Sequence, residues 1–79
     1  MSAFESAFEI KNTGDSSVQF ILEPWGNEIA VSPGSTVRVG FRSHDLKTIP
    51  ITHKNGCIVV EGWEGVEATG MWLDGELVG

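Results

Sequence analysis

Apolar and polar residues alternate along most of the chain, in short runs separated by turn residues. The clearest run covers residues 36–42, where Val37, Val39 and Phe41 alternate with polar residues or glycine. A period of two places successive side chains on opposite faces, so each run predicts a half-buried β-strand. We expect seven or eight short strands, at about residues 7–11, 18–23, 29–31, 36–42, 49–51, 58–60, 66–73 and 76–78.

Turn residues between the runs predict how the strands are joined. The Asn-Gly pair at 55–56 and the Asp-Gly pair at 74–75 both favour two-residue hairpins, whose central residues take positive φ. Pro24 is expected to end its strand, because proline cannot donate a hydrogen bond to a sheet, and Pro50 is expected to mark an edge strand or bulge. The Pro-Gly pair at 33–34 suits a type II turn, which would splay a hairpin. It therefore predicts a corner where the chain crosses to another sheet.

These signals predict an all-β protein, either a small antiparallel barrel or a two-sheet sandwich. The 79 residues suffice for a single β domain over 1–79, in which we expect residues 1–6 to be loosely held. The expected core consists of alternating apolar residues and one tryptophan: Phe8, Ile10, Val18, Phe20, Leu22, Ile29, Val31, Val37, Val39, Phe41, Ile49, Ile51, Ile58, Val60 and Trp72.

The chain is acidic, with a net charge of −6, and its charges are unevenly distributed. All Lys and Arg residues precede residue 55, whereas residues 55–79 contain acids and no Lys or Arg. An acidic surface repels phosphate groups, so we expect no nucleic-acid partner and no membrane partner. The acids either serve solubility or form a face that meets a basic protein.

The sequence favours a cytoplasmic location. No apolar run approaches the roughly 20 residues that span a bilayer. The first residues lack the basic start and apolar segment of a signal peptide. Cys57 is the single cysteine, so it cannot form the internal disulfides on which small secreted domains usually depend.

His53 and Cys57 lie four residues apart and, with His44 and Met71, offer the ligand types of a blue copper site. In the expected hairpin, Lys54 opposes Cys57, so His53 and Cys57 point to opposite faces. No histidine follows Cys57, as one does in cupredoxin-type sites. We therefore expect no metal, and Cys57 is interpreted as a small apolar residue.

Two other groups contain the residue types of a catalytic site. Residues 43–45 read Ser-His-Asp, but neighbours in an extended loop point apart and cannot converge as a triad. Glu61, Glu64 and Glu67 surround a glycine-rich loop, yet a domain of this size leaves little room for a cleft between facing carboxylates. We therefore expect neither an enzyme nor a bound cofactor.

Three tryptophans provide most of the aromatic surface. Trp72 lies in the last predicted hairpin and is expected in the core. Trp25 follows a strand-ending proline and either covers an open end of the barrel or belongs to a binding surface. Trp63, between glycines in a loop, is the best candidate for an exposed contact. A cation–π contact from Arg38 or Arg42 to one of these rings is an equally plausible structural use.

The Glu-Pro-Trp-Gly pattern at 23–26, followed by Pro-Gly at 33–34, resembles a group of small uncharacterised bacterial all-β proteins. The resemblance covers residues 18–39 well and 58–78 loosely. Its motifs are turn and aromatic residues, which specify a fold more than an activity. The resemblance therefore implies a bacterial β-protein and assigns no function, cofactor or functional residue.

The sequence thus favours a non-catalytic protein-binding or accessory module. We expect its contact surface to join Trp25 and Trp63 with an acidic rim of Glu61, Glu64 and Glu67. The partner would be another protein or a second copy of the chain, because a small core gains stability from association. The alternative is a small carbohydrate-binding module in which Trp25 and Trp63 stack on sugar rings.

Overall fold

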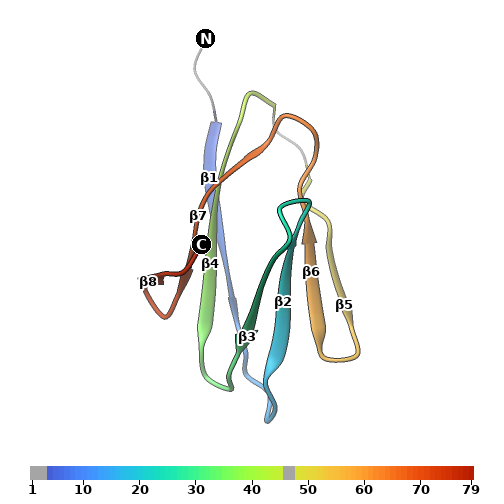
Figure 1. The fold of residues 1–79 in the computed structure, drawn as a ribbon, viewed down its shortest axis with the longest axis vertical. Helices are drawn as coiled ribbons and strands as arrows, with labels where there is room; N and C mark the ends of the chain where they lie inside the picture. Colours follow the sequence, from blue (N-terminus) through green and yellow to red (C-terminus); the bar gives the residue numbers. More distant parts are fainter. Residues whose placement is uncertain (1–3, 46–47) are drawn as a thin grey trace.

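The structure, a computed structural model, describes residues 4–45 and 48–79. Over these residues the chain forms two four-stranded sheets that pack face to face (Figure 1). The fold is a two-sheet sandwich rather than a closed barrel, which confirms the all-β prediction. The strands are β1 (Phe4–Lys11), β2 (Val18–Glu23), β3 (Asn27–Val31), β4 (Thr36–Ser43), β5 (Ile51–Lys54), β6 (Cys57–Glu61), β7 (Glu67–Leu73) and β8 (Glu76–Leu77).

Each sheet combines distant parts of the chain. Sheet A has the strand order β1-β4-β7-β8, and sheet B has the order β3-β2-β6-β5. All pairs are antiparallel except β2 and β6, which run parallel. A parallel pair needs a long connection. Here the chain passes through β3, crosses to β4 in sheet A and returns through β5 before it forms β6.

The predicted corner at residues 33–34 is confirmed. β3 ends in sheet B at Val31, and β4 begins in sheet A at Thr36. Between them Gly34 has a φ of 87°, and the backbone N–H of Ser35 donates to the carbonyl oxygen of Ser32 at 3.0 Å. These are the features of a type II turn with glycine at its third position.

Both predicted two-residue hairpins are also confirmed. Asn55 and Asp74 are the non-glycine residues with positive φ in the described ranges, at 47° and 49°. Each precedes a glycine of positive φ, as a type I′ turn requires. The turns set the register, so that Lys54 opposes Cys57 and His53 opposes Ile58.

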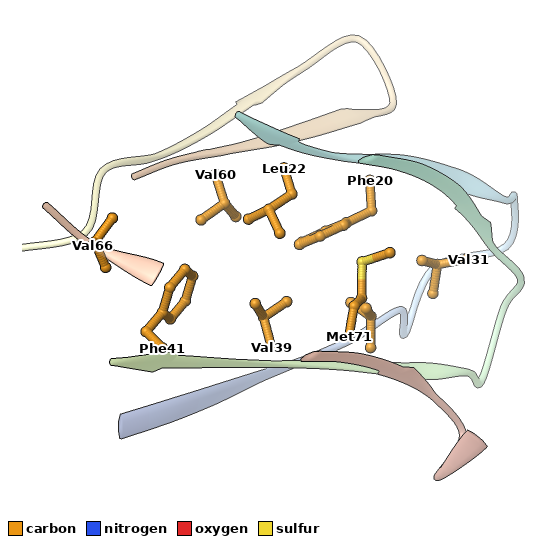
Figure 2. Packing of buried hydrophobic residues seen from close by; sticks show 9 residues of the cluster. Phe20, Leu22, Val31, Val39, Phe41, Val60, Val66 and Met71 are labelled. Carbon is orange, nitrogen blue, oxygen red and sulfur yellow. The ribbon is translucent and has the colours of Figure 1, made fainter. Parts of the chain in front are cut away.

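The core lies between the two sheets. Figure 2 shows Phe20 and Leu22 of β2 facing Val39 of β4 and Met71 of β7 across the interior. The period of two explains this arrangement, because alternate residues of each strand share its inner face. The buried apolar residues are Phe20, Leu22, Val31, Val37, Val39, Phe41, Val60, Val66 and Met71.

The expectation that Trp72 belongs to the core is wrong. Trp72 opposes Leu77, as the hairpin predicts, but the pairing of β7 with β4 puts Met71 opposite Val39 on the inner face. Trp72 therefore lies on the outer face of sheet A, opposite Arg38. The guanidinium carbon of Arg38 is 5.7 Å from the centre of the indole, which is the expected cation–π contact.

The start of the chain also differs from the expectation. The sequence predicts a first strand from about residue 7, but β1 already begins at Phe4, where Phe4 pairs with Ser43 and Ser6 pairs with Phe41. Residues 1–3 lie outside the described ranges. β1 is therefore a long strand that borders sheet A along the whole length of β4.

Candidate functional site

The loops that carry Trp25 and Trp63 lie side by side at one end of the sandwich. β2 and β6 are parallel neighbours, and Glu23 is aligned with Glu61 where the two strands end. The backbone N–H of Gly62 donates to the carbonyl oxygen of Glu23 at 2.7 Å. Parallel strands leave a sheet from the same end, so this pairing joins the two aromatic loops.

Trp25 covers the core at this end and keeps part of its ring exposed. The indole rests on Gly62, where an added Cβ would lie 2.5 Å from Cη2 of Trp25. Its ring centre is 6.1 Å from that of Phe41, with the planes tilted by 43°. The side of the indole that faces away from these contacts leaves Trp25 37% exposed. Trp25 can therefore both cover this end of the core and belong to a binding surface, the two roles expected from the sequence.

Trp63 is half-buried and packs against the core, so the expectation of an exposed ring is corrected. The backbone N–H of Val66 donates to the carbonyl oxygen of Trp63 at 3.1 Å, and Gly65 has a φ of 91°. This tight turn leaves Glu64 exposed at its tip and Trp63 at its base. The Nε1 atom of Trp63 is buried and finds no hydrogen-bond partner in the described part of the chain.

The three acids of the predicted rim have different surroundings. Glu61 and Glu64 are exposed on the two sides of the turn. Glu67 lies opposite Arg42 in sheet A and accepts a hydrogen bond from its guanidinium at 2.7 Å. This hydrogen bond lowers the pKa of Glu67 and raises the pKa of Arg42. Glu67 is therefore paired within its own sheet, whereas Glu61 and Glu64 are exposed.

The residues considered for metal binding and catalysis do not converge. His53 and Cys57 point to opposite faces of the hairpin, as its register predicts. Within residues 4–45 and 48–79, no three His, Cys, Asp or Glu side chains are grouped closely enough to hold a metal ion. The hydroxyl of Ser43 accepts a hydrogen bond from the backbone N–H of Asp45 at 3.1 Å, which makes it part of a local turn.

Sequence reasoning missed an exposed apolar surface that lies along one long side of the sandwich. β1 borders sheet A and β5 borders sheet B. Phe4 on β1 is 49% exposed, Ile51 on β5 is 51% exposed, and Phe8 and Ile10 are half-buried. We call this surface the open side, defined by Phe4, Phe8, Ile10, Ile51 and Ile58.

The open side contains a cleft that reaches into the core. The cleft has a volume of about 550 Å³ and lies between the end of β1 and the hairpin of β5 and β6. Its apolar walls include Ile10, Val37 and Ile58, and His53 lies at its rim. At the other end of the open side, Phe4 and Trp63 line a smaller hollow.

Asn12 lines this cleft and has a structural role. Its side-chain amide donates to the carbonyl oxygens of Ser16 and Val31, at 2.8 and 2.9 Å, and its Oδ1 accepts from the N–H of Gly14 at 3.0 Å. These bonds fix the loop between β1 and β2. They leave the buried Asn12 amide with no free donor for a ligand.

Compared with models of protein families, with curated proteins and with solved structures, the chain gives no match. Among the described residues there is no helix of the length and apolar character that a membrane crossing requires.

Proposed function

We propose that the protein is a non-catalytic accessory module that binds a protein segment in extended conformation along its open side. The observation that carries the proposal is that β1 pairs with β4 along one edge, while no strand of the described ranges pairs with its other edge. Free strand edges accept extended segments through backbone hydrogen bonds. The apolar side chains beside the edge would supply specificity.

The backbone of β1 supports this mode of binding. Asn12 directly follows β1. Its N–H donates to the carbonyl oxygen of Ser35 at 2.9 Å and its carbonyl oxygen accepts from the N–H of Gly34 at 2.7 Å, so both groups point toward the turn that leads into β4. The backbone N–H and C=O groups of successive residues point to opposite edges of a strand. The even-numbered residues of β1 therefore bond to β4, and the N–H and C=O groups of Glu5, Ala7, Glu9 and Lys11 point outward.

The apolar side chains beside this edge also support the binding of an extended segment. Phe4 and Ile51 are each about half exposed, on the inner faces of the two edge strands. An added strand beside β1 would cover both inner faces and remove apolar surface from water. We propose further that this module is bacterial and cytoplasmic, on the strength of the residue pattern at 23–34 and the single cysteine.

The test is a selection of random dodecapeptides displayed on phage against the intact protein, with the variant Ala7→Pro as the matched negative. Proline at position 7 removes an outward N–H and leaves the bonds to β4 intact. Ala7→Val keeps the N–H and serves as the positive control. Peptides of alternating polarity that bind the wild type and Ala7→Val, but not Ala7→Pro, would support the proposal.

Equal binding of the selected peptides to all three proteins would contradict strand addition at β1. A selection that enriches no sequence would also contradict it, provided that the chain does not occupy this edge itself. Circular dichroism and thermal unfolding would confirm that all three proteins are folded.

Carbohydrate binding is a second candidate, and it rests on Trp25. Trp25 is 37% exposed, and a partly exposed indole suits stacking on a sugar ring. Because Trp63 is half-buried, the platform would consist of one ring. Quenching of fluorescence by a glycan in the wild type, but not in Trp25→Phe, would support this function, and no response across a broad glycan panel would exclude it.

A further inference from the structure

We propose that the segment bound at the open side is β1 of a second copy of the chain, paired antiparallel about a two-fold axis at Phe8. The proposal rests on strand addition at β1 as the proposed function. It identifies the partner and the register. Sheet A would then continue across two molecules, with β1 of each copy at its centre.

The alternation of faces restricts the possible registers. In β1 the even-numbered side chains face the interior, because Ser6 and Phe8 oppose the buried Phe41 and Val39. Residues directly opposite in an antiparallel pair share a face. The two-fold axis must therefore pass through a residue of β1. An axis through the peptide bond between two residues would place the inner-face residues of one copy opposite the outer-face residues of the other.

Charge selects among these registers. Centring on Phe8 places Glu5 opposite Lys11 of the second copy, twice by symmetry, and Ala7 opposite Glu9. Centring on Ala7 instead places Glu5 opposite Glu9, and centring on Glu9 places Glu9 opposite itself. Opposite charges stabilise such cross-strand pairs and like charges destabilise them. The strand is thus complementary to itself in one register.

The same register uses all outward backbone groups of β1. Glu5, Ala7, Glu9 and Lys11 would each lie in a hydrogen-bonded pair with the second copy. Each such pair exchanges two bonds, so the edge would form about eight. A register shifted by two residues forms fewer, because one end of the strand then extends past its partner.

Apolar contacts agree with this pairing. Phe8 already stacks on Phe41, with ring centres 5.5 Å apart, and at the axis it would meet Phe8 of the second copy. Sheet B of one copy would face sheet B of the second copy, edge to edge, across the central pair of β1 strands. This arrangement would cover Ile51 and Ile10, which the single chain leaves partly exposed. A domain of 79 residues buries a limited core and gains stability from such coverage.

The test is sedimentation equilibrium of the intact protein over a wide concentration range, with charge variants that report the register. We expect the wild type to dimerise and Ala7→Pro to remain a monomer. Glu5→Lys and Lys11→Glu should each weaken the dimer about tenfold, since each places like charges opposite one another twice. The double variant Glu5→Lys/Lys11→Glu restores opposite charges and should recover the wild-type association.

Hydrogen exchange measured by NMR gives a second readout. The amides of Ala7 and Glu9 should become protected as the concentration of the wild type rises, and Ala7→Val should behave in the same way. A dimer that is insensitive to both charge variants would overturn the proposed register. A wild type that is monomeric at all concentrations would overturn self-association, and the peptide selection would then decide separately whether β1 accepts another protein.

Discussion

Two of the three tryptophans rest on bare glycine backbone. The indole of Trp25 lies on Gly62, and that of Trp72 lies on Gly70, where an added Cβ would approach its ring to 2.6 Å. Glycine permits this contact because it has no side chain between the ring and the main chain. These glycines are therefore required by close packing, whereas Gly34 is required by its positive φ.

The contact at Gly62 leads to a prediction for Gly62→Ala. The new methyl group would displace the indole of Trp25, and we expect the free energy of unfolding to fall by about 1–3 kcal/mol. Urea unfolding would measure the loss, and the Trp fluorescence should move to longer wavelength. The same substitution in a Trp25→Phe background should cost less, because the smaller ring leaves room for the methyl group. An equal cost in both backgrounds would show that the indole is not the source of strain.

Asp74 joins the last hairpin to the start of β4. Its Oδ1 accepts a hydrogen bond from the backbone N–H of Thr36 at 2.9 Å, which lowers the pKa of Asp74. A carboxyl whose pKa is lower in the folded state than in the unfolded state stabilises the fold at pH values above its ordinary pKa. That stabilisation is lost as the pH falls through about 4 and below.

We therefore expect Asp74→Asn to reduce the acid dependence of stability. Asparagine tolerates the positive φ of this turn and keeps an acceptor oxygen, but it does not titrate. Urea midpoints measured between about pH 2.5 and 7 should fall less steeply in the variant than in the wild type. The variant Asp15→Asn removes one acid from an exposed loop and serves as the control. Parallel pH profiles for the wild type and Asp74→Asn would contradict the role of this hydrogen bond.

At the scale of the elements, the sequence predicts the turns and strands, because these features depend on residues that are adjacent in the chain. The hairpins at 55–56 and 74–75 and the corner at 33–34 follow from residues that favour positive φ, and all three are confirmed. The strands between them follow from alternation. These features could be predicted because each depends on a few adjacent residues.

Features that depend on the pairing of distant strands could not be predicted. Met71 and Trp72 are adjacent and both apolar, so only the register with β4 decides which of them enters the core. Trp63 was expected to be exposed because it follows a glycine in a loop, but the parallel pair of β2 and β6 holds its loop against the core. The open side escaped prediction for a related reason. Pro50 marks β5 as an edge strand, as expected, but no local signal identifies β1 as the edge of the other sheet or places the two edges on one side.

The corner between the sheets provides a prediction at this scale. Gly34 has a φ of 87°, and an added Cβ would meet no atom within 4 Å, so any cost of Gly34→Ala comes from the backbone. We expect a loss of about 1–2 kcal/mol in the free energy of unfolding. Gly34→Asn should cost less, because asparagine enters the left-handed region more easily. If the two variants lose the same stability in urea unfolding, strain at this φ is not the cause.

At the scale of the whole molecule, one layer of side chains between two sheets supplies the core. Phe20 from sheet B lies at its centre and is fully buried (Figure 2). With few buried residues, the loss of any one of them removes a large share of the stability of a small domain.

We expect Phe20→Ala to lower the free energy of unfolding by about 3–5 kcal/mol, because it removes apolar contacts and leaves a cavity. Leu77→Ala truncates an apolar residue that is 65% exposed on β8, and it should change stability by less than about 0.5 kcal/mol. Thermal unfolding followed by circular dichroism would measure both. Similar losses in the two variants would contradict the position of the core.

The place of β4 in sheet A also has a consequence for synthesis on the ribosome. β4 lies between β1, which precedes it, and β7, which follows it after the strands of sheet B have been made. A nascent chain that has reached β6 can complete sheet B, but it lacks Met71 and one neighbour of β4. The sandwich therefore closes only after β7 leaves the exit tunnel, and until then β4, paired with β1 on one edge, exposes its other edge, on which a chaperone could act.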